Sequence, residues 1–289
     1  MNPPLPAPFL TLFRARLAPS LLFLLLLTMG LGTPSLKAQG VVINEVQYHP
    51  ASTNLLEQWF ELYNTGAAGV DLSGWRVTKG VDFLFPTNTI LPAGGYLVVA
   101  ADAATFMAKN PGVANFVAGW TGTLGHSLEI SDASGAVVNS INFYDQGDWA
   151  TRVLGADGVV GALDAYKGLG WSSYALHDGL GASLELINPA LPNNYAHNWG
   201  ANRLTNSTPG AANSIRSANV APFIASVTHL PAIPQPTDPV TITARIVDEA
   251  PSGVSVGLHW RVDGSPAFSL LTMADDGAHG DGLPGDGIY

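Results

Sequence analysis

The sequence contains no cysteine. A disulfide framework, a thiolate metal site and a cysteine nucleophile are therefore excluded. The chain has 289 residues, a length that suggests about two domains. A chain of this size can bury enough apolar surface to fold without covalent cross-links.

Charge is scarce, since charged residues make up 12% of the chain, about half of the usual ~25%. Residues 1–40 hold three basic and no acidic side chains, so the remainder carries 9 basic and 22 acidic residues, a net charge of −13. Nucleic-acid binding needs clustered Lys and Arg, and anionic lipid surfaces repel an acidic chain. We therefore expect no direct binding to nucleic acid.

Long amphipathic helical patterns with charged faces are also missing. The chain instead has 32 glycines and 21 prolines, which punctuate many short apolar segments. Short apolar segments that are separated by turn residues are typical of β-proteins. The composition therefore favours an all-β fold.

Residues 1–40 have the features of an export signal. Arg14 and Arg16 form a basic flank, residues 21–29 form an apolar core, and residues 38–40 offer small side chains for cleavage. An uncleaved anchor is the alternative, because residues 17–36 carry no charge, but two prolines and two glycines interrupt them. We expect a secreted, periplasmic or cell-surface protein with no stable membrane span after cleavage.

The residues between 58 and 77 predict two packed β-layers. In residues 59–64, Trp59, Glu61 and Tyr63 alternate with Phe60 and Leu62, which is the period of a half-buried strand. A turn of small residues follows at 65–69, and residues 70–77 start a second apolar set. Strands with large aromatic residues and glycine-rich links favour sheet-on-sheet packing.

Four separated motifs occur in a recognisable order. They are Ile43-Asn44-Glu45-Val46, Trp59-Phe60-Glu61-Leu62-Tyr63-Asn64, Val70-Asp71-Leu72-Ser73-Gly74-Trp75 and Leu91-Pro92-Ala93-Gly94-Gly95-Tyr96-Leu97-Val98-Val99. This order resembles the lamin tail domain, in the version found in secreted bacterial proteins. The resemblance implies an immunoglobulin-like β-sandwich over residues 41–213. It also implies an accessory module, of the kind that accompanies nucleases, phosphatases or spore-coat-type kinase domains.

Within residues 41–213, further elements follow from the pattern. Residues 96–101 predict a central apolar strand, residues 103–109 a short helix, and residues 127–131 and 137–144 a hairpin. Gly125–Ile130 and Gly181–Leu186 are similar in sequence, and we expect both to lie at sheet edges. A long insertion at 145–180 separates these parts of the domain, and residues 206–213 close it.

The last part of the chain predicts a second β-domain. Residues 214–221 form a polar linker, and residues 222–289 resemble part of an immunoglobulin-like or fibronectin type III-like module. Residues 240–247 alternate and are expected to pair with residues 254–262. About 70 residues are fewer than the ~100 of such a sandwich, so we expect this second sandwich to be incomplete, in a fragment or a truncated reading frame.

A glycine-rich loop near the end carries four aspartates, Asp275, Asp276, Asp281 and Asp286. Carboxylate oxygens are the ligands that calcium prefers, although the spacing does not match an EF-hand. Aspartate and glycine also favour turns without any metal. Calcium is thus a possible ligand, turn formation is the alternative, and no other cofactor is expected.

The insertion is rich in aromatic residues, namely Trp149, Tyr166, Trp171 and Tyr174. Such residues form binding platforms for sugars or partner proteins, because they offer large contact areas with few rotatable bonds. The alternative is that they pack as a small core beneath the insertion. If they form a platform, the partner is a protein or a cell-envelope glycan.

No catalytic motif is complete. Glu45, Glu57 and Glu61 can be imagined as acid/base groups, but we expect carboxylates on strands to face solvent. The seven histidines are scattered and form no metal-binding pair in sequence, which leaves only zinc bound by distant His and Asp as an alternative. The segments around Ser127 and Ser183 have Glu where the second glycine of Gly-x-Ser-x-Gly belongs.

Three functions remain open. The first is a non-catalytic binding or scaffolding module of an exported or cell-surface protein. The second is the N-terminal accessory region of a larger secreted enzyme. The third is a calcium-dependent adhesion module.

Overall fold

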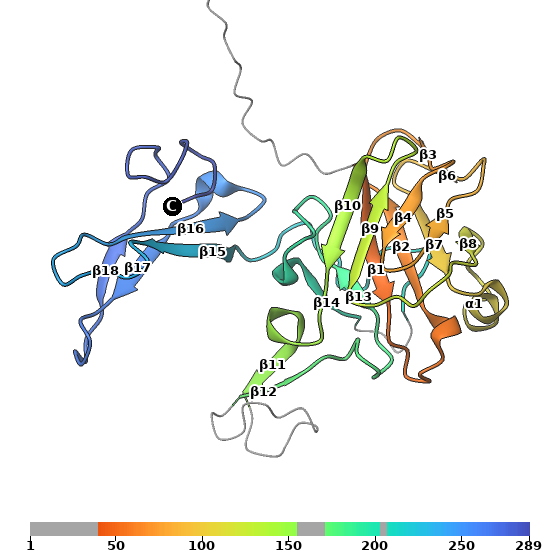
Figure 1. The fold of residues 1–289 in the computed structure, drawn as a ribbon, viewed down its shortest axis with the longest axis horizontal. Coiled ribbons are helices and arrows are strands. Elements are labelled where there is room, and N and C mark those ends of the chain that lie inside the picture. Colours follow the sequence, from red (N-terminus) through yellow and green to blue (C-terminus); the bar gives the residue numbers. More distant parts are fainter. Residues whose placement is uncertain (1–39, 155–170, 203–206) are drawn as a thin grey trace, which may run out of the picture. The chain divides into compact units, whose positions relative to one another are not determined.

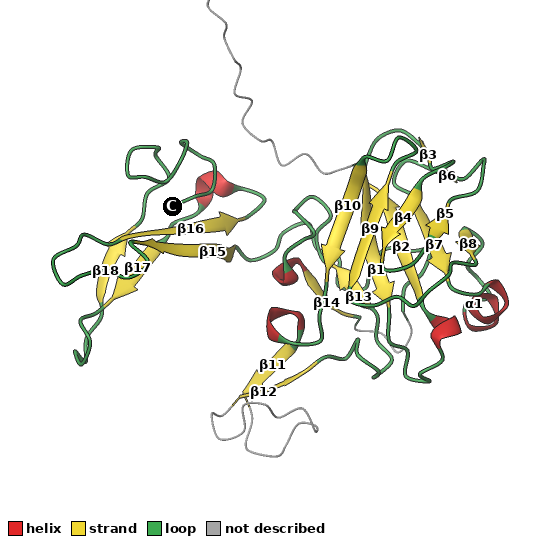
Figure 2. Cartoon of the chain, in the orientation of Figure 1, coloured by secondary structure: helices red, strands yellow, loops and turns green. Residues whose placement is uncertain are grey.

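The computed structural model describes residues 40–154, 171–202 and 207–289 (Figures 1 and 2). Residues 40–154 and 171–202 form mainly β-structure around two sheets. The larger sheet has six strands in the order β14-β13-β1-β2-β7-β8. Its strands are β14 (Trp199–Ala201), β13 (Leu184–Leu186), β1 (Val41–Gln47), β2 (Trp59–Asn64), β7 (Tyr96–Ala100) and β8 (Phe116–Ala118).

The second sheet has four strands in the order β10-β9-β4-β5. They are β10 (Val137–Asn142), β9 (Ser127–Ser131), β4 (Arg76–Lys79) and β5 (Phe83–Leu84). One hydrophobic core contains buried side chains from both sheets, among them Phe60, Leu128 and Ile141. The predicted β-sandwich is therefore confirmed, as is the predicted hairpin of β9 and β10.

The larger sheet is buried on both faces at its centre. Phe60 and Leu62 of β2 point into the sandwich core. Their neighbour Trp59 packs in a separate cluster with Val98 and Phe106 on the other face, which we call the outer face. The alternation expected for β2 is confirmed, but the expectation of a half-buried strand is wrong, because both faces of β2 are covered.

Two elements cover the outer face. The helix α1 (Ala103–Lys109) places Phe106 against Trp59, with the ring centroids 6.2 Å apart. Asp102 begins α1 by accepting a hydrogen bond from the Thr105 amide. Residues 208–215, which we call the closing segment, contact the glutamates of β1, β2 and β13.

Smaller ribbons and 3-10 turns complete this part of the chain. β3 (Val70–Asp71) pairs with β6 (Ile90–Leu91). Within the predicted insertion, β11 (Thr151–Leu154) pairs with β12 (Trp171–Tyr174) after the turn η2 (Gly147–Trp149), so the insertion contains a hairpin. The turn η1 (Leu55–Glu57) precedes β2, and η3 (Ala196–Asn198) precedes β14.

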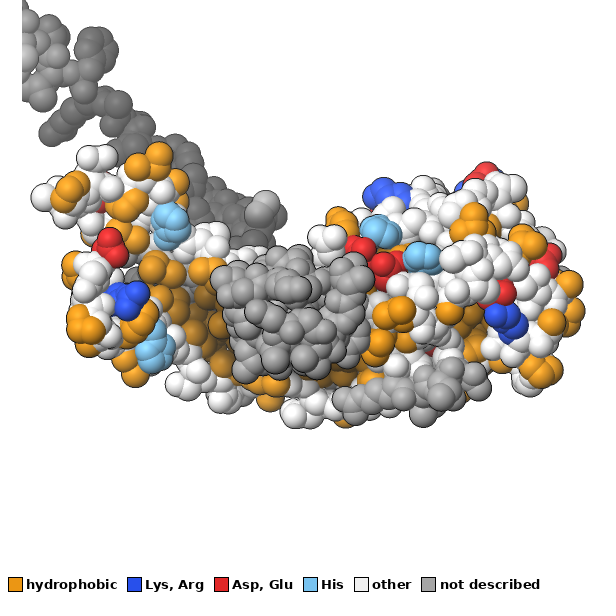
Figure 3. All heavy atoms as spheres, turned by 90° about the horizontal axis from the view of Figure 1, so that it is seen from below, with side chains coloured by type: hydrophobic (Ala, Val, Ile, Leu, Met, Phe, Trp, Pro, Cys, Tyr) orange, Lys and Arg blue, Asp and Glu red, His pale blue; other side chains and the backbone are white. Residues whose placement is uncertain are grey.

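Residues 222–289 form two further hairpins. β15 (Phe223–Leu230) pairs with β16 (Thr241–Val247), and β17 (Gly257–Trp260) pairs with β18 (Ser269–Thr272), with η4 (Pro251–Gly253) between the hairpins. The expected pairing of residues 240–247 with 254–262 is therefore wrong. Most of the exposed large hydrophobic side chains among the described residues lie here, and Figure 3 shows them in orange over these hairpins.

The expectation that the two similar segments lie at sheet edges is also wrong. β9 lies between β10 and β4, and β13 lies between β14 and β1. The strand β7, expected at the centre, has a partner on each side but neighbours the edge strand β8. In the described part of the chain, no helix has the length and hydropathy needed to cross a membrane.

Candidate binding pocket and buried carboxyl cluster

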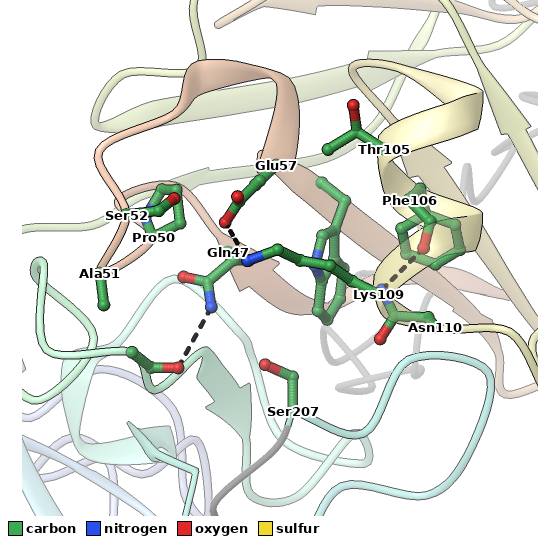
Figure 4. Close-up of a pocket in the computed structure, with 12 residues that line it drawn as sticks. Gln47, Pro50, Ala51, Ser52, Glu57, Thr105, Phe106, Lys109, Asn110 and Ser207 are labelled. Carbon is green, nitrogen blue, oxygen red and sulfur yellow. Dashed lines mark hydrogen bonds and ion pairs between the residues drawn. The ribbon is translucent and has the colours of Figure 1, made fainter.

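A pocket with a volume of about 440 Å³ lies beside α1 (Figure 4). Its residues come from β1, the loop after it, η1, β2, α1 and two later loops. They are Gln47, Pro50, Ala51, Ser52, Glu57, Trp59, Thr105, Phe106, Lys109, Asn110, Gly181 and Ser207. Volumes of this order are typical of small-ligand sites.

The strand register explains where the pocket lies. Gln47 of β1 is directly opposite Trp59 of β2, two positions beyond the pair Glu45 and Glu61. Side chains two positions apart share a face, so all four lie on the outer face. The closing segment contacts the two glutamates, and Phe106 of α1 contacts Trp59. The pocket is therefore the part of the outer face between these two covering elements.

Gln47 is the polar group that extends into this pocket (Figure 4). The residue is only 6% exposed, and its Oε1 atom is buried without a hydrogen-bond partner. Its Nε2 atom makes one long contact, 3.4 Å, to the Gly181 carbonyl oxygen. A buried carbonyl oxygen without a donor costs about 1–3 kcal/mol, so a bound group that donates to it would recover this energy.

An ion pair forms one side of the pocket. Lys109 Nζ of α1 donates to Glu57 Oε2 of η1 across 2.5 Å, and Figure 4 shows the two side chains pointing toward each other. Burial of Glu57 opposes its ionisation, but hydrogen bonds from Lys109, Ser52 and Asn54 outweigh burial and lower its pKa. The carboxylate and the ammonium therefore compensate each other, and the pocket has no net charge from this pair.

Three glutamates lie in a row beside the pocket. Glu185 of β13 is opposite Glu45 of β1, which is opposite Glu61 of β2. All three residues are fully buried. The expectation that Glu45 and Glu61 face solvent is wrong, and Glu185 was not singled out. The signal in the sequence was a lone acidic residue inside each of three largely apolar strands.

The closing segment supplies hydrogen-bond donors to this row. The Thr208 amide donates to Glu45 at 3.0 Å, and the Gly210 amide donates to Glu61 at 2.5 Å. Ser214 and the Ile215 amide donate to Glu185 at 2.8 and 3.1 Å. The predicted role of residues 206–213 in closing the domain now has a chemical basis for its described residues.

The geometry accommodates a proton on one carboxyl group of the row. Thr208 Oγ1 lies 2.9 Å from both Glu45 Oε2 and Glu185 Oε1. A hydroxyl group has one hydrogen and can donate to only one of them. A proton on the other carboxyl group would give this second contact a donor.

The electrostatics favour Glu45 as the protonated group. Burial raises the pKa of Glu45 to about 7, and Glu185 adds to this rise, while hydrogen bonds from Ser183 and Thr208 oppose it. Burial also raises the pKa of Glu61 well above its ordinary value, with a further contribution from Glu45. Like charges that are directly opposed on a sheet repel, so a shared proton reduces the repulsion between the glutamates of the row.

The four aspartates of the glycine-rich loop are hydrogen-bonded to nearby backbone amides. Asp275 accepts from Gly285, Asp286 and Gly287, and Asp281 accepts from Asp276, Gly277 and His279. Asp286 accepts from Leu283 and Ile288, and Asp276 from Ala278. Among the described residues, no group of three or more His, Asp or Glu is placed to hold a metal ion. Turn formation accounts for these contacts, and calcium binding stays a prediction.

The predicted aromatic platform is only partly described. Trp149 is half-buried against the sandwich core, with its ring 6.2 Å from that of Trp199. Trp171 and Tyr174 lie in β12, opposite Leu154 and Thr151, but their side chains lie outside the described set. Tyr166 lies outside the described residues altogether. For Trp149, packing against the core is what the structure describes.

Three histidines gather around Tyr48, although the sequence suggested that they were scattered. The rings of His49, His126 and His177 lie 6.3, 5.4 and 5.9 Å from the Tyr48 ring. His49 Nδ1 contacts Asp178 Oδ1 at 2.5 Å. Burial lowers the pKa of His177, which favours the neutral ring. Strand and loop positions that are far apart in sequence create this group, so spacing alone could not show it.

Residues 34–148 match the family model of the lamin tail domain. Comparison with curated proteins found no match. The matched residues contain β1 to β10 and thus most of both sheets, while β13, β14 and the closing segment follow them. The expected motifs around Glu45 and Glu61 lie inside the matched segment. Residues 34–148 are therefore similar to the lamin tail domain, and the rest of the chain lies outside this match.

Proposed function

We propose that this chain is a non-catalytic binding or scaffolding module of an exported or cell-surface bacterial protein. The observation that carries the proposal is the polar pocket on the outer face, where the buried acceptor Gln47 Oε1 has no partner. The lamin tail domain is an immunoglobulin-like domain and is generally non-catalytic. The export signal expected in residues 1–40 supports the proposed location.

No catalytic arrangement competes with binding at this pocket. Ser52 hydrogen-bonds to Glu57, but Lys109 holds the same carboxylate, so Glu57 is not a free base for this hydroxyl. No Cys or His lines the pocket. Ser183 is fully buried and donates to Glu45, so it is not available to a substrate. These features favour recognition of a ligand over its chemical conversion.

Co-sedimentation tests this proposal. The chain without residues 1–40 is mixed with two samples of purified envelope material from its own cells. One sample has been stripped of its bound protein, and the other retains it. Retention on either sample supports a binding module, and the comparison separates a glycan from a protein partner. Absence of retention on both samples would contradict the proposal.

The alternative proposal is an accessory region of a larger secreted enzyme, such as a spore-coat-type kinase, nuclease or phosphatase. The exposed apolar side chains of β15 to β18 favour it, since Leu230 is 68% and Ile233 is 83% exposed. Such patches mark surfaces that contact further polypeptide. Immunoblotting of the native cells tests this proposal: a band far above 30 kDa supports it, and a stop codon directly after Tyr289 in the intact gene contradicts it.

A further inference from the structure

We propose that the pocket beside α1 binds a single neutral sugar unit, with Gln47 Oε1 as the acceptor for one of its hydroxyl groups. This inference rests on the proposed binding function and names the ligand class. Three features of the pocket lead to it: its charge, its unpaired acceptor and its apolar wall.

The charge of the pocket argues against an ionic ligand. Glu57 and Lys109 are in contact at 2.5 Å, and each neutralises the other. The remaining polar lining residues are uncharged amides and hydroxyls. A charged ligand would have to break the ion pair or lose its hydration without a counter-charge, and both are costly. A neutral ligand faces neither cost.

The unpaired acceptor requires a ligand that donates hydrogen bonds. Gln47 Oε1 is buried and unpartnered, and the Gly181 carbonyl oxygen beside it has only a long contact with Gln47 Nε2. Ser52 and Ser207 add hydroxyl groups to the lining. A sugar presents hydroxyl groups that both donate and accept, so it can serve all of these partners at once.

The other lining residues suit the apolar face of a sugar ring. Ala51 is exposed and the buried Pro50 and Trp59 contribute carbon atoms to the lining, and the volume of about 440 Å³ accommodates a small ligand. A purely apolar ligand would leave Gln47 Oε1 unpaired, and water alone would leave the apolar wall exposed. A ligand that is polar at its edge and apolar on its face matches both parts.

The test is a calorimetric titration of the chain without residues 1–40. The probes are cellotriose and the trimer of N-acetylglucosamine as neutral sugars, and trigalacturonic acid as an anionic one. We expect millimolar binding of a neutral sugar and much weaker binding of the acidic one. If no neutral sugar binds at millimolar concentration, the proposal is overturned.

Two variants tie the binding to the pocket. Gln47→Met keeps the length of the side chain and removes the acceptor, so affinity should fall at least about tenfold. Ala51→Trp fills the pocket from an exposed position and should abolish binding. Unchanged affinity in both variants would overturn the proposed site, even if the wild-type chain binds sugar.

A matched control distinguishes a glutamine that serves the pocket from one that stabilises the core. Gln58 is also buried, but its amide bonds to the Tyr48 and Leu124 carbonyls and to the Leu124 amide. Gln58→Met should lower the melting temperature because it leaves these groups unpaired, whereas Gln47→Met should not lower it. If Gln47→Met unfolds the chain as Gln58→Met does, Gln47 has a structural role and the proposal fails.

The outcome is distinct from that of the proposed function. Retention on envelope material that persists in Ala51→Trp would mean that binding occurs elsewhere, which overturns the sugar pocket and leaves the binding module intact. Loss of retention in both pocket variants, with the fold preserved, is the result expected here.

Discussion

Replacing Glu45 with Gln should remove a large part of the pH dependence of folding. The pKa of Glu45 is about 7 in the folded chain, against an ordinary value of 4.5. The folded state therefore binds a proton more tightly than the unfolded state. Stability from this group is fully present below pH 4.5 and is lost as the pH rises through 7.

The magnitude follows from the difference between the two pKa values. Each pH unit corresponds to about 1.4 kcal/mol, so the rise from 4.5 to about 7 corresponds to a loss of about 3 kcal/mol between pH 4.5 and pH 8. The raised pKa of Glu61 acts in the same direction. Wild-type stability should therefore fall steadily over this window.

Glutamine fits the contacts of the protonated Glu45. Its oxygen can accept from Ser183 and from the Thr208 amide, as Glu45 Oε1 does. Its amide nitrogen can donate to Thr208 Oγ1, which is then free to donate to Glu185. We expect Glu45→Gln to equal the wild type near pH 5 and to exceed it by about 3 kcal/mol near pH 8.5.

Urea unfolding at pH 5 and pH 8.5 measures this difference. Trp59, Trp120 and Trp199 are buried in the sandwich, whereas Trp260 is 49% exposed, so tryptophan fluorescence reports mainly on the sandwich. With a slope of about 3 kcal/mol per molar urea, the two midpoints should differ by about 1 M at pH 8.5.

Glu129→Gln is the control, because the pH dependence of stability that it removes has the opposite sign. Its hydrogen bond with Lys79 lowers the pKa of Glu129, so its contribution is present above its ordinary pKa and is lost at low pH. If Glu45→Gln loses stability with pH as steeply as the wild type, Glu45 does not hold the shared proton and the reasoning is refuted.

Four further outcomes are expected. Asn64→Ala should cost about 3 kcal/mol or more, measured by urea unfolding, because the two N–H groups of the buried Asn64 amide serve three carbonyl oxygens within hydrogen-bond distance. Gly80→Ala should lower the melting temperature far more than Gly94→Ala, since both have positive φ but only the Gly80 Cβ would meet a backbone oxygen, at 2.4 Å. If the aspartate loop binds calcium, millimolar calcium should raise the melting temperature of the wild type but not of Asp281→Asn; an unchanged wild-type value would contradict this. A fragment of residues 41–148 should show no cooperative unfolding, because Glu45 and Glu61 would lose the donors of the closing segment, and a sharp transition would show that those donors are dispensable.

The sequence predicted local structure better than it predicted strand partners. The alternation in residues 59–64, the hairpin of residues 127–131 and 137–144 and the helical segment 103–109 appear as expected, because each depends on residues that are close together. The partner of β16 was wrong, because alternation defines a strand but not its neighbour. β16 pairs with the preceding β15 and leaves β17 to pair with the following β18.

The candidate site was harder to predict because its chemistry depends on burial. Glu45 and Glu61 were noticed, but carboxylates on strands are usually exposed, and nothing near them in sequence suggested cover. Their cover comes from residues 208–215, more than 140 positions later. Gln47 gave no signal, because an unpaired amide becomes informative only when its surroundings are known.

The outer face explains why buried acids belong in this sandwich. A segment without regular structure has backbone amides that must find acceptors when it is buried. The closing segment has no helix or strand, and its Thr208, Gly210 and Ile215 amides all donate to the glutamate row. The glutamate carboxyl groups therefore supply the hydrogen-bond acceptors that the carbonyl groups of a neighbouring strand would otherwise supply. Gln47 lies on the same face of β1, two residues after Glu45. At this position no donor reaches its Oε1 atom. The end of this polar face beside α1 is thus where the fold leaves an acceptor unpaired.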